Sequence, residues 1–127
     1  TQKQYPKKGL LKFFHGGKDT VAGIKPALKT AIPDLGAYGT LVVGAPVWAG
    51  KPAAPINSFF AAADLAGKKV AVFASSAGCN ASRTLELMGE AVTGAGASLL
   101  CSESFVNPVS CPDKALVTIK AFAEKLR

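Results

Sequence analysis

The sequence predicts a single α/β domain built on a parallel β-sheet, and three observations indicate this class. The chain has 127 residues, 49% hydrophobic and 18% charged, which suits one hydrophobic core and leaves no room for a second. From residue 41 onwards, short apolar runs alternate with loops and with stretches of helical period. The apolar runs have no polar alternation, which is typical of strands covered by helices on both faces.

Two of these apolar runs are the predicted interior strands, Leu41 to Ala45 and Val70 to Ala74. A weaker third strand is expected at Ser98 to Cys101, leading into Glu103 to Val106, because Gly94 to Gly96 marks a break before it.

Helical periodicity fills the stretches between and after the strands. Pro55 is expected to open a short helix, since proline is tolerated in the first turn. Asn80 or Ser82 can cap a second helix that runs to about Thr93. Its residues expected to face the sheet are Leu85, Met88 and Val92.

A final helix is predicted at the end of the chain. Ser110 followed by Asp113 resembles a capping box, which marks a helix start. The expected apolar stripe of this helix consists of Leu116, Ile119, Phe122, Ala123 and Leu126.

Residues 1–37 differ from the β/α core predicted for residues 38–127, although both belong to one domain spanning 1–127. Glycines and prolines interrupt the first segment too often for a long helix, so an extended arm is expected. Seven lysines against Asp19 give the first thirty residues +6 of the net charge of +7. Asp34 to Tyr38 is expected to form a helical turn, with Tyr38 packing at the entry to the first strand.

Composition excludes several functional classes. Cys79, Cys101 and Cys111 form neither a CxxC pair nor a metal-ligand spacing, and His15 is the single histidine. A zinc site, a disulfide framework and a serine hydrolase are therefore not expected, and no catalytic residue is predicted.

Apolar stretches such as Leu41 to Trp48 fall short of the roughly 20 residues needed to cross a bilayer. With no apolar signal region behind the first lysines, the expected location is cytoplasmic. The basic arm lacks arginine and the aromatic pattern of nucleic-acid readers, so we interpret it as a solvated surface.

Two loops are candidates for a ligand site. In an open parallel sheet, ligands bind beyond the carboxyl ends of the strands, where Pro46 to Pro52 and Ser75 to Asn80 would lie. The first loop offers the aromatic surface of Trp48 beside Gly50, and the second is small throughout, so a ligand can approach its backbone closely. Neither loop holds a carboxylate or histidine, which favours binding over proton abstraction.

These segments, in this order, resemble flavodoxin-like proteins. The resemblance is carried by Tyr38 to Gly50 (YGTLVVGAPVWAG), Pro55, Leu65 to Phe73 (LAGKKVAVF) and Ser75 to Gly78 (SSAG). The arm segments YPKKG and KFFHGGK resemble what precedes the Tyr-Gly strand in one bacterial subgroup of the family.

The resemblance implies a doubly wound sheet that binds FMN noncovalently, with the flavin ring against the Trp48 loop and its pyrimidine edge against the serine-rich loop. The implied cofactor-binding residues are Pro46, Val47, Trp48, Ala49, Gly50, Lys51, Ser75, Ser76, Ala77, Gly78, Cys79 and Asn80.

The chain departs from the family pattern at its beginning. Flavodoxin-like proteins hold the FMN phosphate in a Ser/Thr-rich loop between the first strand and the first helix, and no Thr-Gly-Asn-Thr-like stretch occurs in the 127 residues. In the strand order 2-1-3-4-5, omission of the first strand leaves Leu41 to Ala45 as a bare edge. We expect a second copy, giving a homodimer, or part of the arm to fill that edge.

The function that follows from the resemblance is that of an FMN-binding flavoprotein, either an electron-transfer protein or an oxidoreductase. Its partner would be a redox protein or a small electron acceptor. One alternative is a flavin-free interaction module that binds a protein through its sheet edge or basic arm. Another, resting only on the charge of the arm, is a nucleic-acid-binding accessory protein. The absorbance of oxidised flavin in the purified protein separates the first two possibilities.

Overall fold

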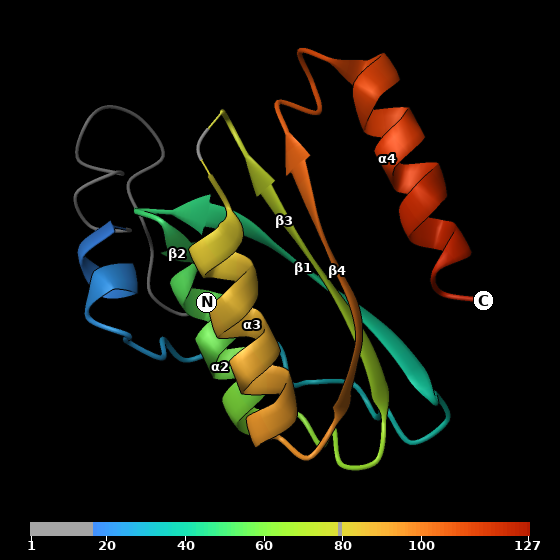
Figure 1. Cartoon of the computed structure of the whole chain (residues 1–127). Coiled ribbons are helices and arrows are strands. Elements are labelled where there is room, and N and C mark those ends of the chain that lie inside the picture. Colours follow the sequence, from blue (N-terminus) through green and yellow to red (C-terminus); the bar gives the residue numbers. More distant parts are fainter. Residues whose placement is uncertain (1–16, 79) are drawn as a thin grey trace.

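The computed structural model describes residues 17–78 and 80–127, which form an α/β fold with helices on both faces of a four-stranded sheet (Figure 1). The strand order is β2-β1-β3-β4, with β1, β3 and β4 parallel and β2 antiparallel to β1. The strands are β1 (Thr40–Trp48), β2 (Lys51–Pro52), β3 (Lys69–Ser76) and β4 (Ser98–Val106). The labelled helices are α2 (Ala54–Ala62), α3 (Ser82–Gly94) and α4 (Pro112–Glu124).

Strand β3 lies at the centre of the parallel part of the sheet and confirms one of the two predicted interior strands. The other, Leu41 to Ala45, lies in β1, which pairs with β3 on one side and, among the described residues, only through Val47 and Trp48 on the other. In β3, Val70 to Val72 and Ala74 are completely buried, because helices cover both of its faces. The pair Leu41↔Val70 sets the parallel register with β1, and β4 follows on the other side as the predicted third strand.

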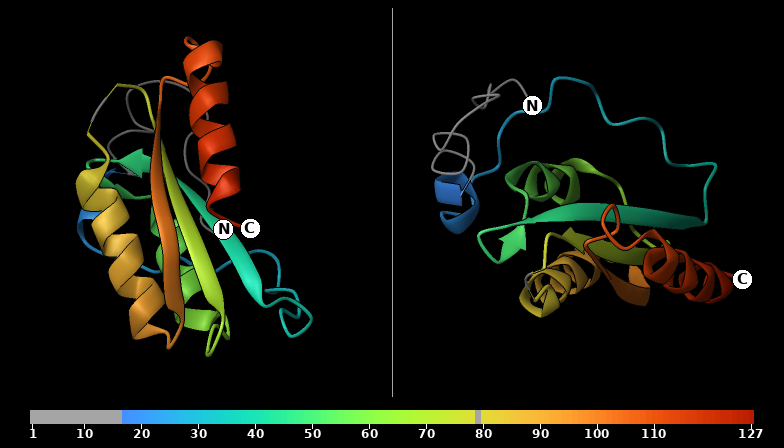
Figure 2. Two further views of the ribbon diagram at one scale, coloured as in Figure 1. Left: turned by 45° about the vertical axis from the view of Figure 1, so that its right-hand side comes forward. Right: turned by 90° about the horizontal axis from the view of Figure 1, so that it is seen from above.

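One face of the sheet is covered by α2 and α3 (Figure 2). Its core packs Val43 and Val72 of the sheet against Phe60, Met88 and Val92 of the two helices. Met88 and Val92 are fully buried and Leu85 packs beside them, so the predicted sheet-facing residues of α3 are confirmed.

The start of α3 is stabilised by the residue before it. The Oδ1 of Asn80 accepts a hydrogen bond of 2.7 Å from the backbone N–H of Ser82, although the cap position itself is Ala81. This bond satisfies one of the N–H groups that a helix leaves unpaired at its first turn.

Helix α4 covers the opposite face, in a position that Figure 2 shows clearly. Three rings form its contact with the sheet: the centroids of Phe73 and Phe105 lie 5.3 Å apart, and Phe122 lies 6.2 and 6.1 Å from them. The Phe73 ring also lies across Gly44, where any Cβ would overlap it.

The prediction for α4 was wrong in two details. Of the predicted apolar stripe only Phe122 is buried, whereas Leu116 and Ile119 are about half exposed. Among the described residues no second helix lies beside α4 on this face. Only the side of α4 that carries Phe122 therefore contacts the sheet.

The expected capping box at Ser110 is also absent. The cap position is Cys111, without a side-chain hydrogen bond, and the helix opens on Pro112. Asn107 explains the difference, because its carbonyl accepts the backbone N–H groups of Ser110 and Cys111 and turns the chain into the helix. Pro112 has no N–H to satisfy in the first turn.

The described part of the arm, residues 17–37, lies alongside α2. Residues 17–21 are helical, and no regular element occurs between them and β1. The Ser58 hydroxyl donates to the Pro26 carbonyl at 2.6 Å, and the Lys68 ammonium donates to the carbonyls of Leu35 and Tyr38, each at 2.9 Å.

The expected packing of Tyr38 was wrong, since its side chain is 58% exposed. The backbone of this residue is the part that is held: its N–H donates to Leu35 and its carbonyl accepts from Lys68. A turn rather than a helix precedes β1 here. The expectations for residues 1–16, including His15, and for Cys79 concern positions outside the described residues.

The described residues contain neither a candidate membrane span nor a candidate metal site. No helix within 17–78 or 80–127 combines the length and apolar character required to cross a membrane. In the same ranges, His, Cys, Asp and Glu do not gather into a group of three that could hold a metal ion.

The two described cysteines differ in environment, which gives a testable difference in reactivity. Cys111 is exposed, whereas burial raises the pKa of the partly buried Cys101 thiol, with Glu103 adding to the shift and Lys125 opposing it. Because the thiolate is the reactive form, we expect iodoacetamide to modify Cys111 before Cys101 at neutral pH. We also expect the rate at Cys101 to rise at higher pH than usual for a thiol.

Peptide mapping by mass spectrometry of the native protein, alkylated at several pH values, measures both rates. Equal rates at neutral pH would contradict the placement of Cys101. Since the pKa is raised on folding, the protonated thiol contributes stability at neutral pH that is lost as the pH rises through the folded-state pKa.

Candidate functional site at the sheet rim

The carboxyl ends of the three parallel strands meet at one rim of the sheet (Figure 1). The register pairs Pro46 with Ser75 and Ser76 with Val106, so the three strands end side by side. The loops that follow β1 and β3, which the sequence predicts as a ligand site, therefore lie next to each other. We call the residues 46–52, 75–80 and 107–111 the rim loops.

The first rim loop is a β-hairpin rather than the open loop expected. Strand β1 continues three residues past its predicted end to Trp48, which pairs with Lys51. The turn between them is Ala49-Gly50, with φ of 49° and 75°. Positive φ at both turn positions is the geometry that matches the twist of the flanking strands. The hairpin holds the half-buried Trp48 on regular structure.

Gly50 should be the sensitive position of this turn. Its φ of 75° lies in the left-handed region, so Gly50→Ala is expected to lower the free energy of unfolding by about 1 kcal/mol. Gly39→Ala is the control, because nothing lies within 4 Å of a Cβ at Gly39 and its φ is not in that region. Urea unfolding followed by circular dichroism measures both; equal effects would contradict the hairpin geometry.

The second rim loop brings small residues to the same edge. Ser76 is buried at the end of β3, and Ala77, Gly78 and Asn80 are exposed. Gly78 has a φ of 104°, which only glycine adopts readily. Its backbone is therefore open to close approach by a ligand. The remaining predicted residue of this loop, Cys79, is outside the described residues.

A third rim loop was missed by the sequence analysis. It follows β4 and begins at Asn107, whose N–H donates to the Ser76 carbonyl at 2.8 Å. The Asn107 amide nitrogen would lie 3.4 Å from a Cβ at Gly78, so the second and third loops are in contact. The Asn-Pro pair after the third predicted strand is a turn pattern that could have indicated this loop.

The Lys51 side chain is directed towards the arm. Its ammonium donates to the Val21 carbonyl at 3.1 Å. Lys51 also lines a groove of about 480 Å³ that lies along α2 and α3, together with residues such as Phe60 and Leu87. Among the predicted site residues that the structure describes, Lys51 therefore contacts the arm. The others lie in the rim loops.

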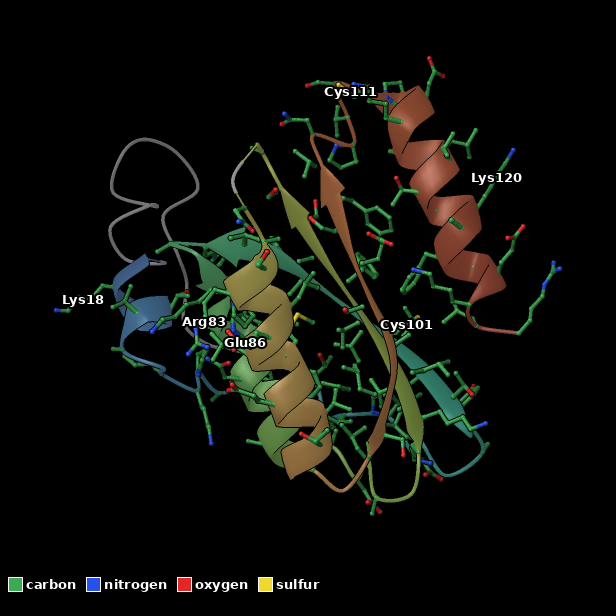
Figure 3. All side chains as sticks on the ribbon, viewed as in Figure 1. Lys18, Arg83, Glu86, Cys101, Cys111 and Lys120 are labelled. Carbon is green, nitrogen blue, oxygen red and sulfur yellow. The ribbon has the colours of Figure 1, made fainter. Side chains whose placement is uncertain are left out.

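The rim loops carry no carboxylate and no histidine. The nearest arginine along the chain, Arg83 at the start of α3, pairs with Glu86 at 2.6 Å. Figure 3 labels both residues, which lie on α3. This hydrogen bond raises the pKa of the Arg83 guanidinium above its usual value, so the side chain stays charged. The rim loops therefore lack the imidazole and carboxylate side chains that most often act as general acids and bases.

These features define a doubly wound α/β domain whose rim loops lie at the carboxyl ends of its parallel strands, where ligands bind in folds of this class. The sequence model of the family described as flavodoxin matches residues 18–99. The chain belongs to the flavodoxin family.

Solved structures with the same fold are similar to this chain. A Bacteroides uniformis protein assigned as a flavoprotein has a TM-score of 0.65 and 22% identity, over 83% of this chain and 69% of that protein. A Lactobacillus acidophilus flavoprotein, crystallised in complex with FMN, has a TM-score of 0.61 and 22% identity, over 91% of this chain and 75% of its own. At 22% identity, the similarity to these structures establishes the fold alone. Comparison with curated proteins found no match.

Proposed function

We propose that this protein binds FMN at the rim loops and that the bound flavin exchanges electrons with a redox protein or a small acceptor. The observation that carries the proposal is the position of Trp48, on a hairpin beside the small, glycine-containing loop after β3. Family membership and the FMN complex of the Lactobacillus flavoprotein support it.

The rim residues fit the ring of the flavin. Trp48 would stack on the ring, the Gly50 peptide would face its redox-active edge, and the backbone at Ala77 and Gly78 would bind its pyrimidine edge. The flavin, when bound, supplies the one- and two-electron chemistry. The protein's own part is to position the ring, limit its contact with water and set the charge around it.

The described rim residues fit the phosphate of FMN less well than they fit the flavin ring. No Thr-Gly-Asn-Thr-like stretch precedes a helix at the rim in residues 17–78 and 80–127. The serine-rich loop before α3 would face the flavin ring, and the Oδ1 of Asn80 already occupies the N–H of Ser82. Ring contacts would then supply most of the affinity. We expect riboflavin to bind within about threefold of FMN, since a phosphate without N–H donors adds little.

Titration of FMN and riboflavin with the protein, followed by flavin fluorescence, tests the proposal. Trp48→Leu is expected to weaken the binding of both about tenfold, because stacking on an aromatic side chain contributes roughly 1–3 kcal/mol. Phe59→Leu is the matched control, a half-buried aromatic residue of α2. Absence of saturable binding by the wild-type chain, or equal loss in both variants, would overturn the proposal.

The redox potential should follow from the absence of carboxylates in the rim loops. The anionic reduced flavin is destabilised by nearby carboxylates and stabilised by nearby positive charge, which Lys51 supplies within the rim loops. We therefore expect a two-electron potential above that of free FMN, measured by dye equilibration. A potential below that of free FMN would contradict this expectation.

A flavin-free interaction module is the second candidate function. The outer edge of β1 has no strand partner within residues 17–78 and 80–127 apart from β2, and it favours this function because unpaired strand edges are sites of protein association. A colourless protein that leaves FMN fluorescence unchanged would support this function over the first.

A further inference from the structure

A groove of about 480 Å³ lies between the arm and the helices α2 and α3. Its walls come from residues within 20–25 of the arm, 57–61 of α2 and 87–95 at the end of α3, with Lys51 and Pro52 of β2 at one end. Figure 2 shows these elements on the side of the sheet away from α4. Of the described residues that line the groove, none belongs to β1 or α4. Its volume is in the range of small-molecule sites.

The two helices supply an elongated apolar wall. Phe60 of α2 faces the groove together with Leu87, Ala91 and Ala95, which follow one another at intervals of four residues along α3. At a rise of 1.5 Å per residue, the eight residues from Leu87 to Ala95 span about 12 Å. An extended chain advances about 1.2 Å per bond, so this wall matches an unbranched chain of about ten carbon atoms.

The arm and β2 supply a positively charged end. Lys25 and Lys51 both line the groove, and none of its described lining residues is acidic. The Lys51 ammonium donates to the Val21 carbonyl at 3.1 Å, which leaves two of its three N–H groups for another acceptor. Two cations without a carboxylate between them attract an anion.

The hydroxyl of Thr20 independently indicates a ligand. Thr20 lines the groove and is 1% exposed, and its Oγ1 has no hydrogen-bond partner in the structure. It directly precedes Val21, whose carbonyl holds Lys51, so the hydroxyl and the ammonium belong to the same corner of the groove. A buried hydroxyl without a partner costs free energy, which an acceptor atom of a ligand would recover.

We propose that this groove is a second ligand site, which binds an amphipathic anion: a carboxylate on an unbranched apolar chain of about ten carbon atoms. The carboxylate accepts hydrogen bonds from the Thr20 hydroxyl and the Lys51 ammonium, with Lys25 adding positive charge. The chain lies against Phe60 and the apolar wall of α3. Lys51 and Pro52 are the rim-loop residues that line the groove, so the proposal does not depend on flavin binding.

Titration of the full chain with decanoate, followed by two-dimensional NMR of the backbone amides, tests the proposal. Saturable shifts are expected at Ala61, Ala91 and Gly94, which line the groove. The Kd should be about 1 mM or lower for a ligand of about 12 non-hydrogen atoms. Decyltrimethylammonium, which has a similar chain and the opposite charge, should leave these amides unchanged.

Three results of this titration would overturn the proposal. They are the absence of saturable shifts, shifts confined to the exposed apolar residues of α4, and equal binding of the cationic probe. The second result would show non-specific association with exposed apolar side chains, and the third would show that the positive charge has no role.

Two variants test the polar end. Lys25→Met should weaken decanoate binding about threefold, whereas Lys114→Met, at an exposed lysine of α4, is the matched control and should not change it. Thr20→Val should weaken binding about fivefold without lowering the stability of the free protein, because it removes a hydroxyl that has no partner there. Unchanged affinity in Thr20→Val, or equal losses in the two lysine variants, would contradict the proposed position of the carboxylate.

A third variant tests the apolar wall. Ala61 is exposed and lines the groove, so Ala61→Trp should fill part of the space and weaken binding at least about tenfold. Ala121→Trp, at an exposed alanine of α4, is the matched control and should bind decanoate as the wild type does. Circular dichroism should show the wild-type fold in both variants, and wild-type affinity in Ala61→Trp would overturn the proposal.

Discussion

Met88→Ala is expected to lower the free energy of unfolding by about 2–5 kcal/mol, the range for removing a fully buried large side chain. Met88 lies on α3 with no exposed surface and packs in the cluster that joins Val43 and Val72 to the helices. A domain of this size has a total stability of only about 5–15 kcal/mol. The variant should therefore lose a large part of its stability.

Urea unfolding followed by circular dichroism measures the change. Val117→Ala, at a position 69% exposed on α4, is the control and should change the free energy of unfolding by less than about 0.5 kcal/mol. Equal effects in the two variants would show that α3 does not pack on the sheet through Met88.

Gly44→Val is expected to destabilise the protein by about 1–3 kcal/mol, through overpacking. The Phe73 ring occupies the space that a side chain at Gly44 requires. That ring is held by Phe105 and Phe122, with centroid distances of 5.3 and 6.2 Å, so moving it disrupts the contact between α4 and the sheet. Valine otherwise suits a strand, so the destabilisation would come from the ring.

A double-mutant cycle isolates the contact between these two residues. In a Phe73→Leu background, Gly44→Val should cost at least about 1 kcal/mol less than in the wild type. Gly39→Val is the control, since no atom lies within 4 Å of a Cβ there. Additive effects of Gly44→Val and Phe73→Leu would contradict the packing of the ring on the glycine.

The central strand of the sheet could be predicted because it buries both of its faces. The run Val70 to Ala74 is apolar throughout, and it forms the central strand. The end of β1 was missed because its partner, the two-residue strand β2, is too short to show a period. The turn residues Ala49 and Gly50 alone do not reveal that the chain doubles back.

Helix α4 shows the limit of periodicity. The spacing of its apolar residues predicted the helix, but a stripe does not tell how much of it meets another element. Leu116 and Ile119 remain half exposed because α4 contacts the sheet only through the arc that contains Phe122. Burial here depends on neighbouring elements, which a single segment of sequence does not specify.

The position of the candidate site was predictable because parallel strands bring their carboxyl ends together. Two parts of it were not. The contact of Asn107 with Ser76 joins residues of different strands, and Lys51 turns to the carbonyl of Val21, a residue thirty positions away. Both contacts depend on tertiary structure rather than on local sequence.

In the proposed complex the flavin ring lies against Trp48 at the rim. Trp48 is the single tryptophan of the chain, so its emission reports on this position alone. Titration with riboflavin, which lacks the phosphate, should quench that emission saturably, and FMN should give the same maximal quenching. Saturable binding detected through flavin fluorescence, with Trp48 emission unchanged after inner-filter correction, would place the ring elsewhere and rule out its contact with Trp48.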